Sequence, residues 1–327
     1  MAEIETILSY KVFLWIGFNI LILILLALDL GVFHRKDHAI SVKEGFVWSI
    51  IWIAVAFAFN FVVYLWKGPE VGLQFMTGYL IERALSIDNI FVFLVVFTYF
   101  KVSTKYQYRV LFWGILGALI LRGIFIGVGT LLIAKFHWIL YVFGVFLIIT
   151  AIKLAIGKEK EIEPEKNPVL RIVRKFLPIT PRYEGHNFLV KRNGKIWGTP
   201  LLIVLIVVET TDLVFALDSI PAIFAITLDP FIVYSSNVFA ILGLRALYFA
   251  IAGLMEIFYY LKYALSAILG FVGLKMLVAD FFKISSGAAL MVIGGILVAA
   301  ILISIIFPHH EAVKADESVP TENKKSE

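Results

Sequence analysis

The chain has 327 residues, of which 61% are hydrophobic and only 16% are charged, and its formal net charge is +5. Soluble globular domains carry about 25% charged residues, so this composition argues against a soluble domain and indicates an integral membrane protein. The sequence contains no cysteine, which excludes disulfides, thiolate metal ligands and thiol redox chemistry. Most Lys and Arg residues fall in a few loops between apolar stretches, and we therefore expect no nucleic-acid partner.

Nine stretches are long and apolar enough to be membrane-spanning helices, which need about 20 mainly apolar residues. The sequence therefore predicts an all-α, polytopic transmembrane helix bundle within residues 1–307. Residues 1–11 lack the basic region and the cleavage site of a signal peptide, so we expect the first helix to be retained. In chain order, the predicted spans are about 8–33, 43–66, 71–99, 109–134, 137–157, 199–226, 232–255, 260–281 and 286–307.

The distribution of Lys and Arg predicts how the bundle is oriented. Loops 34–42, 100–108 and 158–198 carry two, two and ten basic residues, whereas the alternate loops carry one or none. By the positive-inside rule, these loops and the C-terminus face the cytoplasm, and the N-terminus lies outside the cell (inner) membrane. We expect the Pro-rich, charged loop 158–198 to be a cytoplasmic linker with one short helix, and the polar residues 308–327 to be a disordered tail.

Two parts of the chain, about residues 71–157 and 199–281, resemble each other through short matches in the same order. Each part contains three predicted spans, and an odd number of spans inverts the second part in the membrane. Inverted repeats with a site at their interface are typical of secondary transporters. Apolar helices can resemble each other through composition alone, but these matches include charged positions. The matched segments are Ser86–Ile90 with Ala216–Ile220, Ile115–Gly117 with Ile241–Gly243, Leu121–Arg122 with Leu244–Arg245, and Ile152–Leu154 with Leu274–Met276.

Eight acidic residues fall within the predicted spans, and five of them lie deep in the third and sixth spans. One central Asp costs about 3 kcal/mol on insertion scales, so five independent acids would cost on the order of 15 kcal/mol. Arg83, Arg122 and Arg245 are available as partners, but three cations leave a negative cavity. The five deep acids are Glu82, Asp88, Glu209, Asp212 and Asp218, and the three near span ends, which we expect to reach the interface, are Asp29, Glu256 and Asp280.

Helical spacing does not bring all five acids onto one side. Glu209 and Asp212 share a helix face, but Glu82 and Asp88 do not. We therefore expect unwound backbone in the third or sixth span, near Asp88 or Asp218, and Pro221 provides a reason for a break in the sixth span. The alternative is that the acids pair with the arginines and only fix helix packing, which does not explain their two symmetry-related positions.

The donor atoms near these acids are oxygens, which suit hard or borderline divalent cations such as Mn²⁺, Ca²⁺ or Mg²⁺. No buried histidine accompanies them, which disfavours Zn²⁺ and Cu⁺. The sequence thus predicts a metal site rather than a catalytic site, and no cofactor is expected. Its predicted ligands are Glu82, Asp88, Asn89, Glu209, Asp212, Asp218 and Ser219.

Two long segments resemble the signature of the TerC family, most closely its Alx-type branch. They are residues 78–92, GYLIERALSIDNIFV, and residues 209–222, ETTDLVFALDSIPA, and the resemblance runs from about residue 15 to 307. It implies nine transmembrane helices, kinship with lysine-exporter-like transporters, and a group that includes Mn²⁺ efflux proteins and is named for tellurite resistance. The family's proposed ligands match Glu82, Asp88, Glu209, Asp212 and Asp218 here. The pair Thr210–Thr211 stands where other members often carry Ser or Ala.

We therefore expect a transporter in the lipid bilayer that exports divalent cations, most plausibly Mn²⁺, with protons as the candidate coupling ion. Moving a divalent cation outward against an inside-negative potential costs about 4.6 kcal/mol per 100 mV, and inward protons would compensate. A second hypothesis is a membrane scaffold or stress-response factor linked to tellurite resistance that acts through residues 158–198 without transport. A third, an intramembrane aspartyl hydrolase, is disfavoured because the Gly-containing active-site motifs of such enzymes are absent. The sequence leaves the oligomeric state open.

Overall fold

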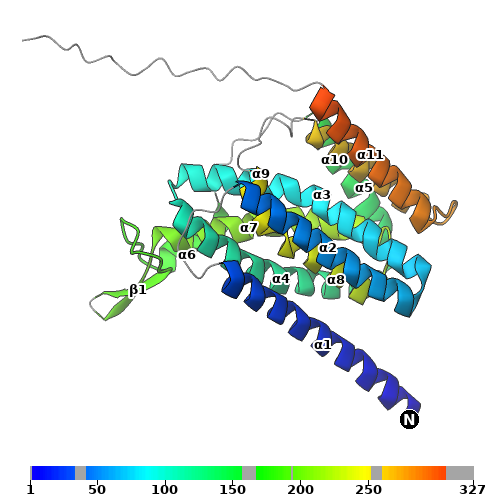
Figure 1. Cartoon of the computed structure of the whole chain (residues 1–327), viewed down its shortest axis with the longest axis horizontal. Coiled ribbons are helices and arrows are strands. Elements are labelled where there is room, and N and C mark those ends of the chain that lie inside the picture. Colours follow the sequence, from blue (N-terminus) through cyan, green and yellow to red (C-terminus); the bar gives the residue numbers. More distant parts are fainter. Residues whose placement is uncertain (1, 34–41, 157–166, 193, 252–259, 307–327) are drawn as a thin grey trace, which may run out of the picture.

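The computed structural model describes residues 2–33, 42–156, 167–192, 194–251 and 260–306 (Figure 1). Within these ranges the chain is almost entirely helical, which confirms the predicted all-α membrane bundle. The elements are α1 (Ala2–Phe33), α2 (Val42–Lys67), α3 (Pro69–Tyr99), α4 (Thr104–Lys135), α5 (Ile139–Ile156), α6 (Pro168–Phe176), β1 (Leu189–Arg192), β2 (Lys195–Gly198), α7 (Pro200–Phe224), α8 (Pro230–Leu242), α9 (Leu244–Ile251), α10 (Leu261–Leu277) and α11 (Ser286–Ile306).

Each of the nine predicted spans corresponds to one helix, or to one pair of helices, in the described ranges. By length and composition, 7 of them can cross a membrane: α1, α2, α4, α5, α7, α11 and the α8–α9 pair taken together. Of the other two, α10 has only 17 residues and α3 carries the charged residues Glu82, Arg83 and Asp88 near its middle. Large apolar side chains are exposed on the outer faces of α1, α2, α4, α5 and α11, as expected for surfaces in contact with lipid.

Helices α3 and α7 form the centre of the bundle, and their side chains contribute to all three apolar clusters of the described residues. One cluster joins them to α1, α2, α4 and α8, a second to α5, α10 and α11, and a third to α4, α6 and α9. Neighbouring helices therefore cover the charged residues of α3 and α7 on most sides. This cover explains how polar helices are accommodated in an otherwise apolar bundle.

The predicted break in the third or sixth span is wrong, because α3 and α7 are continuous helices. Pro221 lies in the last turn of α7, where the loss of one backbone N–H does not interrupt the helix. The break falls instead in the seventh span, at Gly243 between α8 and α9. There the guanidinium of Arg83 donates a hydrogen bond of 3.1 Å from Nη1 to the carbonyl oxygen of Ala240, and a Cβ on Gly243 would lie 2.6 Å from Nη1.

Helices α5 and α10 pack closely through two glycines that face each other. A Cβ on Gly144 would lie 3.0 Å from the carbonyl oxygen of Gly273, and a Cβ on Gly273 would lie 2.8 Å from the carbonyl oxygen of Gly144. The glycines therefore allow the two helix backbones to approach closely. The superposition of the predicted repeats 71–157 and 199–281 stays a prediction.

The short helix expected in the 158–198 linker is α6, and a small hairpin of β1 and β2 follows it at the same end of the bundle (Figure 1). Asn167 caps α6, since its side chain accepts hydrogen bonds from the backbone N–H groups of Val169 and Leu170. In the hairpin, Leu189 lies opposite Gly198. The tail 308–327 and Glu256 lie outside the described residues.

Candidate functional site

A buried arginine, Arg122 of α4, links the two acid-bearing helices. Its side chain is 1% exposed and forms ion pairs with Glu82 of α3 and with Asp212 of α7, the latter at 3.0 Å. Its Nε also donates to Asp212 Oδ2 at 3.3 Å, and its Nη1 donates to Asn237 Oδ1 of α8 at 2.8 Å. One guanidinium therefore connects α3, α4, α7 and α8 at the centre of the bundle.

The two carboxylates at Arg122 are fully hydrogen-bonded. Asn237 donates to Glu82 Oε2 at 3.0 Å, and Asn89 donates to Asp212 Oδ1 at 3.1 Å. Together with the bonds from Arg122, these contacts satisfy all four carboxylate oxygens. In this conformation, Glu82 and Asp212 thus act as partners of Arg122, which is the packing role that the sequence left as an alternative.

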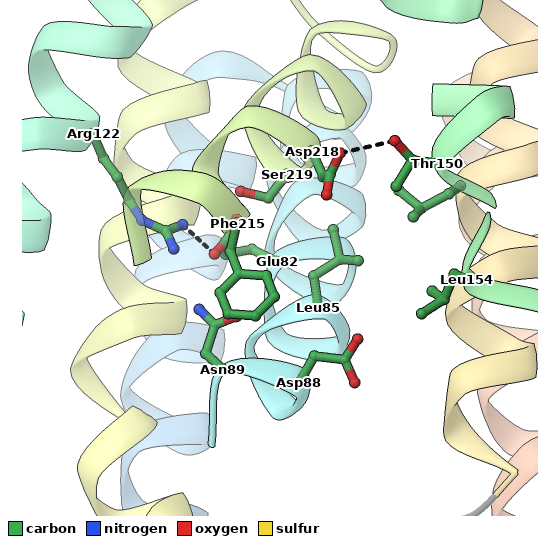
Figure 2. Close-up of a pocket in the computed structure, with 11 residues that line it drawn as sticks. Glu82, Leu85, Asp88, Asn89, Arg122, Thr150, Leu154, Phe215, Asp218 and Ser219 are labelled. Atoms are coloured by element: carbon green, nitrogen blue, oxygen red, sulfur yellow. Dashed lines mark hydrogen bonds and ion pairs between the residues drawn. The ribbon is translucent and has the colours of Figure 1, made fainter. Parts of the chain in front are cut away.

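Beside this network lies a cavity of about 100 Å³ between α3 and α7, closed by α5 and α10 (Figure 2). This volume is large enough for a cation together with several water molecules. Four of its lining residues come in two pairs, Asp88–Asn89 from α3 and Asp218–Ser219 from α7. The pairs occupy matching positions in the predicted repeats, since each Asp follows by six residues one of the carboxylates bound to Arg122.

Two buried oxygen atoms on this cavity have no hydrogen-bond partner among the described residues, Asn89 Oδ1 and Ser219 Oγ. Both side chains are 1% exposed. A buried polar atom without a partner costs about 1–3 kcal/mol, so such atoms indicate that the site receives another group. A cation coordinated by these oxygens would remove that cost.

The two cavity carboxylates lie at different levels along α3. Figure 2 shows Asp218 above the level of Glu82 and Asp88 at the lower end of the view, with Leu85 between the two carboxylates. Asp218 Oδ1 accepts a hydrogen bond of 3.1 Å from the hydroxyl of Thr150 on α5. The cavity therefore extends along the helix axis between two acidic ends.

Glu209 lies apart from this cavity, in a smaller one of about 10 Å³ that Asp212 also lines. Its Oε2 atom is buried and has no hydrogen-bond partner within the described part of the chain. The carboxylate packs directly against Gly117 of α4, where a Cβ would overlap it. Glu209 and Asp212 share one face of α7, as their spacing predicts, and that face is turned toward α4.

The five predicted acids therefore do not converge on one cavity. Asp88, Asp218 and Glu82 line the larger one, whereas Glu209 and Asp212 line the smaller one on the other side of Arg122. Within the described ranges, no three His, Cys, Asp or Glu residues are close enough to hold one metal ion. The continuous helices explain this outcome, because without an unwound segment the acids of one helix point in different directions.

Asp29 of α1 was predicted to reach the membrane interface, but the structure buries it. It is 4% exposed and forms an ion pair with Arg245 of α9, which is itself buried. The guanidinium of Arg245 also lies 4.5 Å from the centre of the Tyr108 ring. The sequence placed Asp29 near a span end, but it could not show that α9 starts beside this position. Asp280, by contrast, is exposed and accepts a hydrogen bond from Tyr141.

Three residues of the site were missed from the sequence: Asn237, Thr150 and Ser86, whose hydroxyl donates to Glu82 at 3.4 Å. A signal for Asn237 was present, because residues 235–237 are three consecutive polar residues inside an apolar span. Asn237 and Ser86 are 1% exposed, and Thr150 is partly buried. Polar residues within membrane helices usually face a partner or a cavity, as they do here.

Comparisons with known proteins relate the chain to a family of integral membrane proteins. An uncharacterized membrane protein of Myxococcus xanthus is 53% identical over 308 residues, which cover 94% of this chain and 96% of the relative. Two proteins named Alx, described as candidate membrane-bound redox modulators, are 47% identical in Salmonella typhi, covering 92% of this chain and 96% of the relative, and 46% identical in Escherichia coli (strain K12), covering 89% and 94%. No solved structure matches the chain. The family described as "Integral membrane protein TerC family" matches residues 67–312, and the chain belongs to this family.

Proposed function

We propose that the protein exports divalent metal cations, Mn²⁺ foremost, through the cavity between α3 and α7. The observation that carries this proposal is the pairing of Asp88–Asn89 with Asp218–Ser219 around one cavity, with two buried oxygen atoms that lack hydrogen-bond partners among the residues that the structure describes. Carboxylate, amide and hydroxyl oxygens are the ligand types that Mn²⁺, Ca²⁺ and Mg²⁺ share. In this proposal Asp88, Asn89, Asp218 and Ser219 bind the cation, and Arg122 holds Glu82 and Asp212 beside it.

The charge of the cavity supports a divalent cargo. Its lining contains three acids, Glu82, Asp88 and Asp218, and one guanidinium, Arg122, which also pairs with Asp212. Four carboxylates around one guanidinium leave an excess of negative charge when the acids are ionised, and a divalent cation reduces that excess more than a monovalent ion does. Neutralisation matters here because an uncompensated charge inside a bilayer costs several kcal/mol.

The arrangement also supports movement between two positions. Asp218 and Asp88 lie at opposite ends of the cavity (Figure 2), so a cation can be handed from one carboxylate to the other along α3. Such a path needs weak sites that release the ion, which agrees with the absence, in the described part of the chain, of a cluster of three acidic or imidazole ligands. Rocking of one repeat against the other would expose each end in turn.

Protons are the proposed coupling ion. Exporting one divalent cation against 100 mV costs about 4.6 kcal/mol, and two protons moving inward gain the same amount, so a one-for-two exchange is electrically neutral. Glu209 is the candidate proton carrier, because its carboxylate lies in the separate cavity on the other side of Arg122. The redox role in the names of the relatives would need chemistry other than thiols in this chain, which has no cysteine.

The test is cation flux in vesicles that contain the purified protein, with Mn²⁺, Ca²⁺ and Mg²⁺ offered in turn. The native protein should move Mn²⁺, and Asp88→Asn and Asp218→Asn should each lower the flux per folded molecule by about tenfold or more, because such sites depend on ligand charge. Asp280→Asn is the matched control, since Asp280 is exposed and lies outside the cavity. Its flux should equal that of the native protein.

Two results would reject the proposal. If the native protein moves none of the three cations, the scaffold hypothesis is favoured. If Asp88→Asn and Asp218→Asn reduce the amount of folded protein but leave the flux per folded molecule unchanged, these acids serve packing and the cation takes another route.

A further inference from the structure

The helix of the linker, α6, has an apolar surface that the rest of the chain covers only in part. Leu170 is 1% exposed and packs in the apolar cluster that contains Leu201 of α7. Next to it, Val169, Ile172 and Phe176 form a row at helical spacing, and they are 40%, 58% and 79% exposed. Half of the apolar face of α6 therefore anchors the helix to the bundle, and the adjacent half remains uncovered.

The opposite face of α6 is basic. Arg171, Arg174 and Lys175 project from it, and the hairpin strands add Lys191, Arg192 and Lys195. In residues 167–199, only Glu184 is acidic, and it forms an ion pair with Arg192. The surface formed by α6 and the hairpin is thus strongly positive and has an apolar row along one edge.

Aromatic contacts place this surface at the level where the bundle leaves the membrane. Tyr183 stacks on Tyr106 of α4, and its hydroxyl donates a hydrogen bond of 2.7 Å to the carbonyl oxygen of Phe100 at the end of α3. Phe188 packs against Trp113 of α4, whose ring remains 46% exposed. Tyr and Trp side chains gather at the membrane–water interface, and Figure 1 places α6 and the hairpin at the corresponding end of the helices.

We propose that α6 lies in the headgroup layer of the membrane and binds anionic phospholipids. Val169, Ile172 and Phe176 insert between the acyl chains, while Arg171, Lys175 and the basic residues of the hairpin contact lipid phosphates. A short helix with one apolar and one basic face is the type of element that binds such a surface, and the basic side is the one predicted to face the cytoplasm, where anionic lipids attract Lys and Arg. The inference is independent of the transported ion.

The lipid-binding surface proposed for α6 and the hairpin is also linked to the centre of the protein. The hairpin leads directly into α7, which begins at Pro200 and carries Asp212 and Asp218. The backbone N–H of Thr199 donates to the carbonyl oxygen of Phe188 at 2.9 Å, so the start of α7 is fixed to the linker. The surface formed by α6 and the hairpin is therefore connected directly to the helix that carries Asp212 and Asp218.

Because the chain has no cysteine, a single introduced cysteine gives one labelling site. We suggest spin labels at Ile172→Cys and Phe176→Cys on the apolar row, and at Arg171→Cys and Lys175→Cys on the basic face. Each variant is placed in lipid nanodiscs at one chain per disc, with either mixed phosphatidylglycerol and phosphatidylcholine or phosphatidylcholine alone. Collision rates with oxygen, which partitions into lipid, and with a water-soluble nickel chelate report the surroundings of each label.

In the anionic discs, the labels at positions 172 and 176 should favour oxygen and those at 171 and 175 should favour nickel. Discs of phosphatidylcholine alone should raise the nickel accessibility at 172 and 176. Nickel accessibility at 172 and 176 in the anionic discs would overturn the proposal. The same pattern in both lipids would also overturn it, because the basic face would then have no role. If the labels at 172 and 176 are protected from nickel only when two chains share a disc, the apolar row contacts a second copy of the chain and the proposal is overturned.

Discussion

Replacing Arg122 with Ala should destabilise the protein more than most single substitutions in the bundle. The guanidinium is 1% exposed and joins α4 to Glu82, Asp212 and Asn237. Its removal leaves two buried carboxylates facing each other, with only neutral donors from Asn237, Asn89 and a hydroxyl. The variant therefore tests whether the central network holds the four helices together.

The magnitude follows from the burial of all three charges. Breaking a buried ion pair by removing one partner costs about 3–5 kcal/mol, whereas a neutral hydrogen bond between membrane helices contributes about 0.6 kcal/mol. The two carboxylates left without a cation, Glu82 and Asp212, thus account for most of the cost. We expect the free energy of unfolding to fall by about 4 kcal/mol for Arg122→Ala. This corresponds to about a 1,000-fold change in the ratio of folded to unfolded protein.

The assay is the folded fraction after extraction into mild detergent, measured across a denaturant series. A matched variant, Arg122→Met with Glu82→Gln and Asp212→Asn, removes all three charges at similar volume and should recover most of the loss, because neutral replacement of a buried ion pair costs little. If Arg122→Ala is as stable as the native protein, or if the triple variant is no better than Arg122→Ala, the reasoning is refuted.

Three further predictions concern single contacts. Ser219→Ala should leave the metal-free protein as stable as the native protein, since the hydroxyl has no hydrogen-bond partner in the described ranges, but should weaken Mn²⁺ binding by about tenfold in a titration; unchanged affinity would remove Ser219 from the site. Gly117→Ala should cost about 1–3 kcal/mol by displacing the carboxylate of Glu209, and Glu209→Ala should relieve that cost in a double-mutant cycle; additive effects would contradict the contact. Gly273→Ala should lower thermal stability through the α5–α10 contact more than Gly270→Ala, whose Cβ would meet only Ala151 at 3.7 Å; equal effects would argue against that contact.

The helices could be predicted from the sequence because length and apolar content determine which segments enter a bilayer. The position of the helix break could not. Pro221 suggested the sixth span, but near the end of α7 a proline is tolerated, whereas Gly243 breaks the seventh span where Arg83 fills the space beside the backbone. That contact joins residues far apart in the chain, and no local sequence pattern predicts it.

The candidate site, too, could be predicted from the sequence only in part. The prediction was that Asp88, Asp212 and Asp218 share one cavity; Asp88 and Asp218 line the same one, but Asp212 lines the other. Which acids Arg122 would bind was not predictable, because Glu82 and Asp212 carry the same charge as Asp88 and Asp218 and differ only in their direction from the helix. The buried Asp29–Arg245 pair was missed for a related reason, since the depth of α1 against α9 is a matter of tertiary packing.

The most direct test of the central claim is the location of bound Mn²⁺ by anomalous X-ray scattering from crystals of the native protein grown with this cation. The account predicts an anomalous peak in the cavity between α3 and α7, with oxygen atoms of Asp88 or Asp218 at about 2.0–2.6 Å and with Asn89 or Ser219 completing the coordination. No such peak should occur with Asp88→Asn combined with Asp218→Asn. A peak elsewhere in the native protein, with this cavity left without metal, would contradict the account.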